Sequence, residues 1–311
     1  MLAEQFTAID TLREIVSRLH ISAGALAAWG AALDAHANGT PLEPAIAAHV
    51  QQVLSVLGAG DALARVEPLE ALPLSAEIRL FTLTNSKLLF AATRDPGWAY
   101  AETELLQAAG NVSVTVAHSI RHGIAPGLDG LAARLEQPGA AFLDIGVGVA
   151  ALSIEMARLW PNLRVVGVDR WKPALDVARE NVRAAGISER VELRLQDGRE
   201  LSDSNAFDLV WIPGAFIPDA VAPALLQRAH KALRPGGWVL FAMFCPREAP
   251  LADAVLRLRA AMFGGAVRVS TEAENLMREQ GFAQVQTLPR RPDSATAMVA
   301  GRRAPASFKG E

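Results

Sequence analysis

An acidic residue and two closely spaced glycines form the segment of this chain most suited to binding a ligand. Asp144, Gly146 and Gly148 lie within Phe142-Leu-Asp-Ile-Gly-Val-Gly-Val-Ala150. The glycines allow a tight turn and a close approach of a ligand to the backbone, because no Cβ intervenes. The spacing also fits the G-x-G-x-x-G/A pattern of dinucleotide sites, with Ala151 as its last member. Asp144 would repel a pyrophosphate but can help to order the loop beside a cationic, amino-acid-like ligand, so we expect the latter.

Two further acids follow at intervals that suit a nucleoside. Asp169 ends Val165-Val-Gly-Val-Asp169, 23 positions after Gly146, and can accept hydrogen bonds from two ribose hydroxyls. The alternative for Asp169 is a helix cap or a solvated loop acid. Asp197 can accept a hydrogen bond from an exocyclic amine such as that of adenine, although an Asp-Gly turn also explains it. Trp171 either packs near such an adenine or lies on a surface helix.

Alternating short apolar runs and helical stretches indicate the elements that position these acids. This alternation is typical of βαβ units, so it predicts an α/β fold with a doubly wound, Rossmann-like parallel sheet. Two more runs, 281–288 and 295–301, predict an antiparallel pair at the edge of the sheet. The expected parallel strands are 141–145, 164–168, 191–195, 207–212 and 238–243.

Together with the turn Arg234-Pro-Gly-Gly237, these motifs resemble those of class I S-adenosylmethionine-dependent methyltransferases over about residues 140 to 302. Asp144, Gly146 and Gly148 match the family's D-x-G-x-G loop, whereas Ala150 stands where many members have a third glycine. The resemblance implies S-adenosyl-L-methionine as the cofactor. It also implies the cofactor-binding residues Asp144, Gly146, Gly148, Asp169, Arg170, Asp197, Gly198 and Ile212.

The N-terminal part of the chain has a helical pattern. Six apolar residues between Leu2 and Leu19 recur at steps of three and four, and Ala-rich stretches 22–37 and 44–57 predict further helices. We therefore expect three parts: an N-terminal helical domain, a linker helix and a methyltransferase domain, over residues 1–112, 113–139 and 140–305. This layout is similar to that of small-molecule O-methyltransferases of secondary metabolism. The apolar stripe predicts a homodimer through the N-terminal helices, unless the stripe is buried within its own domain.

The residues that would act on the acceptor are less clearly marked. His118 and His122 are spaced i, i+4, so they share a face of the expected linker helix and are the candidates for a general base. The alternative is that both are ordinary linker histidines. The family's catalytic histidine, where present, follows the fourth strand, but residues 212–218 contain none. Phe216 and Ile217 there are expected to line an apolar substrate pocket or to fill the core.

Composition narrows the partners of the chain. Thirty Lys and Arg against 33 Asp and Glu give a formal charge of −3, which disfavours a nucleic-acid partner. The single Cys245 excludes an internal disulfide and, with no Cys/His cluster, a structural metal. The N-terminus lacks the pattern of a signal peptide, and no apolar run of roughly 18 residues predicts a membrane span. We expect a cytoplasmic enzyme that acts on a small molecule.

The leading functional prediction is methyl transfer from S-adenosylmethionine to a small, largely apolar, natural-product-like acceptor, at oxygen rather than at nitrogen or carbon. A second hypothesis is a methyltransferase-like protein that binds the cofactor but acts as a cyclase or another non-methylating enzyme. A third is a nicotinamide-dependent dehydrogenase, which Asp144 disfavours.

Overall fold

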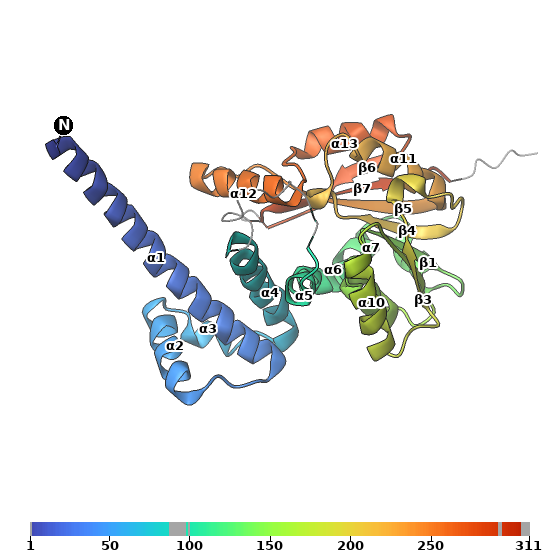
Figure 1. Cartoon of the computed structure of the whole chain (residues 1–311). Helices are drawn as coiled ribbons and strands as arrows, with labels where there is room; N and C mark the ends of the chain where they lie inside the picture. Colours follow the sequence, from blue (N-terminus) through green and yellow to red (C-terminus); the bar gives the residue numbers. More distant parts are fainter. Residues whose placement is uncertain (1, 87–97, 99, 292–293, 306–311) are drawn as a thin grey trace, which may run out of the picture. The chain divides into compact units, whose positions relative to one another are not determined.

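The computed structural model describes residues 2–86, 98, 100–291 and 294–305 (Figure 1). The chain divides into two compact units, Met1–Leu89 and Phe90–Glu311. The division predicted at residue 112 therefore lies inside the second unit. Among the described residues, no helix is both long enough and apolar enough to cross a membrane.

The first unit is helical, and its longest helix runs without a break. The sequence predicted one helix up to Leu19 and another from Ser22. The residues between them are helical as well, so the two stretches form one helix, α1. Asp34 on α1 accepts hydrogen bonds from Ser75 Oγ at 3.0 Å and Arg79 Nη2 at 2.9 Å, both on the last helix of the unit. The helices are α1 (Leu2–Asn38), α2 (Pro44–Val56), α3 (Gly60–Leu63) and α4 (Pro68–Thr84).

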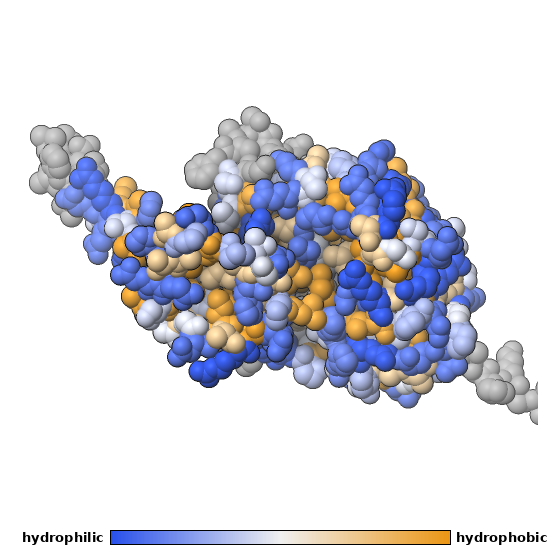
Figure 2. Space-filling model, turned by 90° about the horizontal axis from the view of Figure 1, so that it is seen from below, coloured by the Kyte–Doolittle hydropathy of each residue, from blue (hydrophilic) through white to orange (hydrophobic). Residues whose placement is uncertain are grey.

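Apolar side chains of α1 remain at the surface of this first unit. Leu12, Val16 and Leu19 are 61%, 63% and 59% exposed, so the predicted stripe is not buried within its own domain at these positions. Figure 2 shows hydrophobic and hydrophilic side chains together along this part of the chain. The stripe residues Leu2, Phe6 and Ile9 have side chains outside the described part of the structure.

The second unit contains a seven-stranded sheet in the order β3-β2-β1-β4-β5-β7-β6. The first five strands are parallel, and β7 pairs antiparallel with both β5 and β6. This arrangement confirms the predicted α/β, Rossmann-like fold with an antiparallel pair at the edge. The strands are β1 (Ala141–Ile145), β2 (Arg164–Asp169), β3 (Val191–Leu195), β4 (Phe207–Ile212), β5 (Leu233–Phe244), β6 (Ala283–Thr287) and β7 (Thr296–Arg302).

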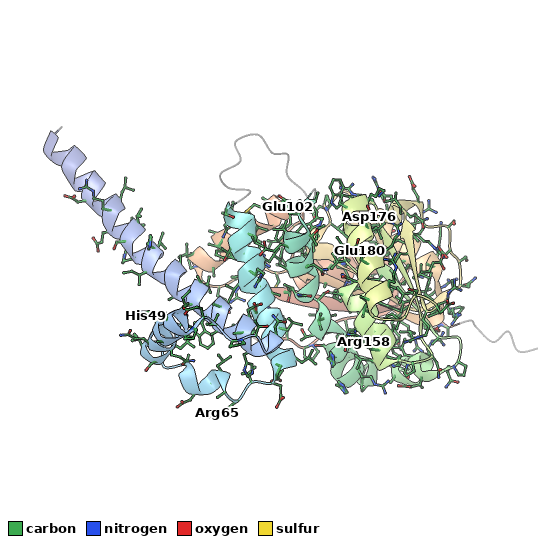
Figure 3. The ribbon with its side chains drawn as sticks, turned by 60° about the horizontal axis from the view of Figure 1, so that its bottom comes forward. His49, Arg65, Glu102, Arg158, Asp176 and Glu180 are labelled. Atoms are coloured by element: carbon green, nitrogen blue, oxygen red, sulfur yellow. The ribbon has the colours of Figure 1, made fainter. Side chains whose placement is uncertain are left out.

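Helices cover both faces of the sheet because successive strand residues point to opposite sides. One apolar core lies between the sheet and α8, α9 and α10, and the other lies between the sheet and α11 and α13. Asp176 and Glu180 lie on the exposed face of α10 (Figure 3). The helices named here are α8 (Leu131–Glu136), α9 (Ala151–Leu159), α10 (Lys172–Ala184), α11 (Ala222–Ala232) and α13 (Ser270–Glu279); α12 (Pro250–Phe263) follows β5.

The segment before β1 differs from the single linker helix expected over residues 113–139. It consists of α6 (Val114–Ser119), a π-helical turn (Ile120–Ile124), α7 (Ala125–Gly127) and α8. Gly130, with φ of +71°, separates the last two. The preceding helix, α5 (Thr103–Asn111), contacts α9 and α10 and therefore belongs to the second unit.

Candidate active site

The glycine loop, residues 146–150, connects β1 to α9 and lies at the carboxyl edge of the sheet. Gly146, Gly148 and Ala150 have φ of +74°, +55° and +64°. A Cβ on Gly148 would have no protein atom within 4 Å, so the loop faces space that a ligand can enter. Ala150 takes the left-handed conformation at the position of the family's third glycine, which costs an L-residue about 1–2 kcal/mol. The backbone turn is thus kept without that glycine.

Asp144 lies beneath this loop with its carboxyl group buried. It is 2% exposed, and Oδ2 accepts a 2.7 Å hydrogen bond from Ser153 Oγ on α9. Burial raises the pKa of Asp144 to about 7; the Ser153 hydrogen bond opposes this shift, and the charge of Asp169 adds to it. The Asp144 carboxyl therefore changes its charge near neutral pH.

Asp169, at the end of β2, holds two backbone segments. Its Oδ2 accepts a 2.9 Å hydrogen bond from Gly148 N–H, and its Oδ1 accepts one of 2.8 Å from Trp171 N–H. Burial raises the pKa of Asp169, and these backbone hydrogen bonds lower it. Each carboxylate oxygen has a second lone pair, which is the requirement for accepting two ribose hydroxyls.

Asp197 follows β3 and caps its own turn. It accepts hydrogen bonds from Arg199 N–H at 2.8 Å and Arg199 Nη2 at 2.7 Å, and its pKa is lowered mainly by the Arg199 side chain. The turn is tightly packed, since a Cβ on Gly198 would lie 2.7 Å from Leu225 Cδ2. Arg170 is exposed beside Asp169. The structure thus brings Asp144, Asp169 and Asp197 to the ends of neighbouring strands, as predicted for the acids.

Ile212 lies at the end of β4. Its side chain is completely buried and packs in the core beside α11, and its role in cofactor binding stays a prediction. Alternation along β4 points this side chain into the core rather than along the strand end. The next residue, Pro213, faces the glycine loop instead: its Cγ lies 3.1 Å from the position of a Cβ on Gly146.

Four aromatic side chains, Trp98, Phe216, Phe244 and Phe263, form what we call the aromatic cluster. The ring centroids of Phe216 and Phe263 are 5.1 Å apart, and Trp98 lies 5.4 Å from Phe263 and 5.6 Å from Phe216. Phe216 follows β4 and Phe244 ends β5, so the cluster lies beyond the carboxyl ends of these strands. Trp98 and Phe216 are only partly buried and keep surface for a ligand, while Ile217 packs partly against the core.

Arg268 fixes the loop that carries Phe216. Arg268 is 6% exposed, and its guanidinium donates hydrogen bonds of 3.3 Å to the carbonyl oxygens of Gly214 and Ile217. It also pairs with the Asp219 carboxylate. No sequence pattern marked this residue, because its partners lie about fifty positions earlier in the chain.

Residues 100–111, which we call the strap, are tied to the cofactor side of the site at two places. The Trp171 indole N–H donates a hydrogen bond to the carbonyl oxygen of Tyr100. Gln107 and Asn181 exchange side-chain hydrogen bonds of 2.9 and 3.2 Å, and Asn181 Nδ2 also donates to the carbonyl oxygen of Val149 in the glycine loop, at 2.9 Å. Sequence reasoning missed the strap, although the position of Trp171 after Asp169 was a signal.

Residues 142–237 match the family model described as "Methyltransferase domain". This part of the second unit is similar to a methyltransferase domain. The matched range contains the glycine loop, the three acids and the Arg234-Pro-Gly-Gly237 turn. A carboxy-S-adenosyl-L-methionine synthase of Actinobacillus succinogenes is 31% identical over 110 residues, which are 34% of this chain and 46% of that protein. The chain spans less than half the length of the curated relatives that it matches first.

Two solved structures are similar over both units. Human N-acetylserotonin methyltransferase in complex with SAM is 16% identical with a TM-score of 0.61, and the match covers 96% of this chain and 98% of that one. The mitomycin 7-O-methyltransferase MmcR is 19% identical with a TM-score of 0.60, over 96% of this chain and 100% of the other. At this identity, the similarity shows a shared fold.

S-adenosyl-L-methionine is the cofactor expected for a methyltransferase domain, and the residues at the carboxyl edge fit it. The open space over Gly148 leaves room for the ligand. Asp169 has the lone pairs for a ribose, and the buried Asp144 provides the negative charge that suits an amino-acid group. Asp197 could accept from an adenine amine only while sharing its oxygens with Arg199.

The two histidines lie along the flank of α9. His118 Nε2 is 3.0 Å from Glu155 Oε1 on α9, and the exposed His122 ring is 6.3 Å from the His118 ring. Arg121 lies over Trp160, which follows α9 at the end away from the glycine loop. Neither histidine belongs to the aromatic cluster, so the role of either as a base stays a prediction. In the described part of the chain, no group of three or more His, Cys, Asp or Glu residues could hold a metal ion.

Proposed function

We propose that this protein transfers a methyl group from S-adenosylmethionine to a small, flat, largely apolar acceptor, at an oxygen atom. The observation that carries the proposal is the position of the aromatic cluster. Phe216 and Phe244 lie at the same carboxyl edge of the sheet as the cofactor residues, and Pro213, in the loop of Phe216, lies against Gly146. Aromatic side chains provide a large apolar contact area with a preferred geometry, which suits a planar natural-product-like ring.

Alignment is the main contribution of the chain to such a transfer. The bound cofactor supplies a methyl group on a positively charged sulfur. Asp169 and the glycine loop would hold its nucleoside and amino-acid parts, and the aromatic cluster would orient the acceptor oxygen toward the methyl group. Correct positioning of two reactants can contribute about 7–11 kcal/mol to lowering a barrier.

Oxygen is the favoured acceptor atom for two reasons. The mitomycin enzyme, whose fold this chain shares, is named for O-methylation. None of the four cluster side chains is a base, so an acceptor that loses its proton readily, such as a phenol, fits the site. N- and C-methylation are the other outcomes that product analysis would distinguish.

Mass spectrometry of reaction mixtures tests this proposal. The purified chain would be incubated with S-adenosylmethionine and a panel of planar phenols, with the Asp169→Ala variant as the control. We expect the parent to add a single methyl group to the oxygen of at least one phenol. Asp169→Ala should catalyse the same reaction much more slowly. Methylation only at nitrogen or carbon would contradict the assignment to oxygen.

A cyclase or another non-methylating enzyme is the second candidate function. It is favoured by the absence of a base in the aromatic cluster and by the similarity to carboxy-S-adenosyl-L-methionine synthase, which is not named as a methyltransferase. Cofactor binding together with a rearranged, unmethylated product would support this candidate over methyl transfer.

We also infer a homodimer formed through α1. The exposed Leu12, Val16 and Leu19 recur on one side of the helix, and burying them against a second copy would remove apolar surface from water. Cytoplasmic location and the lack of nucleic-acid and membrane partners stay predictions from composition.

A further inference from the structure

We propose that Trp171 is a positioning residue that couples occupancy of the donor site to the geometry of the aromatic cluster. The proposal rests on the proposed function, because it requires that S-adenosylmethionine or its product binds at Asp169. It adds a connection between the donor and acceptor sites that the family's motifs do not contain.

On the donor side, Trp171 is attached to the acid expected to bind the ribose. Asp169 Oδ1 accepts the 2.8 Å hydrogen bond from Trp171 N–H, while Oδ2 accepts from Gly148. Ribose hydroxyls that bind these oxygens would share them with the two backbone N–H groups. Binding therefore acts directly on the hydrogen bond that fixes the Trp171 backbone.

On the acceptor side, the indole of the same residue is attached to the strap. Its N–H donates to the carbonyl oxygen of Tyr100, a residue whose own side chain is completely buried. The Tyr100 ring packs edge-on against Trp98, with centroids 4.9 Å apart and planes at 75°. Trp98 in turn contacts Phe216 and Phe263, so every step from Asp169 to the aromatic cluster is a direct contact.

A ligand shifts a conformational equilibrium only if it interacts differently with the two states. Here the difference would arise at Asp169, where the cofactor alters the hydrogen bonding of Trp171, and the packed aromatic rings would transmit it. Coupling between two sites is reciprocal, so an acceptor in the cluster would also strengthen cofactor binding.

The chain offers a specific probe for this coupling, because Tyr100 is its only tyrosine. Protein labelled with 3-fluorotyrosine therefore reports by fluorine NMR on this one position, without knowledge of the acceptor. The ligand to titrate is S-adenosylhomocysteine, and its affinity would be measured separately by calorimetry. Trp171→Phe removes the indole donor and keeps an aromatic ring, and Trp171→Leu is a second variant that also lacks the donor.

Trp238→Phe is the matched control. Its indole N–H also donates to a backbone carbonyl, that of Asp129, at 3.1 Å, but it lies in the half of β5 away from the site. We expect S-adenosylhomocysteine to shift the Tyr100 resonance in the parent and in Trp238→Phe. In Trp171→Phe and Trp171→Leu the shift should be lost, while ligand affinity stays within about threefold of the parent, because the backbone N–H at Asp169 remains.

The outcomes separate this proposal from the proposed function. A parent that shows no calorimetric binding would overturn both. A parent that binds the ligand with no change at Tyr100, or a Trp171→Phe variant that shifts as the parent does, would overturn the coupling alone. If Trp238→Phe also lost the response, the effect would come from general destabilisation, and Trp171 would have no special role.

Discussion

We expect the buried carboxyl of Asp144 to make cofactor binding sensitive to pH. Its pKa is raised to about 7, first by burial and also by the charge of Asp169. The ionised carboxylate suits the cationic amino-acid group of the cofactor, so affinity should rise with pH. With a pKa near 7, we expect binding at pH 6 to be about tenfold weaker than at pH 8. Calorimetry across this range would measure the effect.

Asp144→Asn is the control for this pH dependence. The amide can still accept from Ser153 but cannot ionise, so its affinity profile should be flat and lower at pH 8. The folded carboxyl binds its proton more tightly than the unfolded one, so its ionisation as pH rises toward 8 destabilises the parent fold. Between pH 6 and pH 8, the free energy of unfolding should therefore fall less for the variant than for the parent, which thermal unfolding would measure. A parent affinity that does not change with pH would refute this role of Asp144.

Gly148 can be tested for its place under the cofactor. Gly148→Ala and Gly139→Ala both place a Cβ at positive φ, +55° and +79°, with no protein atom within 4 Å. Both should lose about 1 kcal/mol of stability from the same backbone strain. Only Gly148→Ala should weaken S-adenosylmethionine binding, by about tenfold or more, because its methyl group enters the ligand space. Equal affinities of the two variants would place the ligand elsewhere.

His118 and His122 allow the base hypothesis to be examined directly. A true general base contributes about a hundredfold or more to turnover. If both are ordinary linker histidines on the flank of α9, outside the aromatic cluster, His118→Ala, His122→Ala and the double variant should keep turnover within a few fold. Rates and pH profiles with a phenol that the parent methylates are the measurement. A large loss with unchanged cofactor affinity would show instead that the histidines act in catalysis.

At the scale of elements, the sequence predicted what local patterns determine. β1, β3 and β4 have the expected bounds, because glycine, an Asp-Gly turn or proline follows each of them directly or within two residues. Contacts between distant segments could not be predicted in this way. Tyr100 and Trp171 are 71 positions apart, and Gln107 and Asn181 are 74 apart, and no spacing rule links such pairs.

Helix α1 carries the prediction of a homodimer. Changing Leu12 and Val16 together to glutamate places two charges on the exposed apolar side, which should turn a dimer into a monomer. Leu251→Glu is the matched control, since Leu251 is 73% exposed on α12. Light scattering after size exclusion would report the mass. A monomeric parent at micromolar concentration, or a double variant that stays dimeric, would contradict the role of α1.

At the scale of the whole molecule, the positions of the proposed donor-site acids could be predicted from sequence, whereas the aromatic cluster of the proposed acceptor site could not. Three acids and a glycine loop occur at or just after the ends of successive strands, and the sheet brings them to one edge. The aromatic cluster instead combines Trp98, from before the sheet, with Phe263, at the end of α12. Only the folded chain brings these segments together. The sequence therefore marked Phe216 as a candidate pocket residue but did not predict which side chains surround it.

Calorimetric titration of S-adenosylmethionine into the parent and Asp169→Ala tests the donor site most directly. Asp129→Ala is the control, because Asp129 pairs with Arg302 away from the glycine loop. Leaving buried hydrogen-bonding groups unpaired costs about 1–3 kcal/mol, which corresponds to a roughly five- to 150-fold loss of affinity. We expect one site per chain, weakened by this factor in Asp169→Ala and unchanged in Asp129→Ala. Equal affinity of the parent and Asp169→Ala, or no binding by the parent, would contradict a cofactor site at this edge of the sheet.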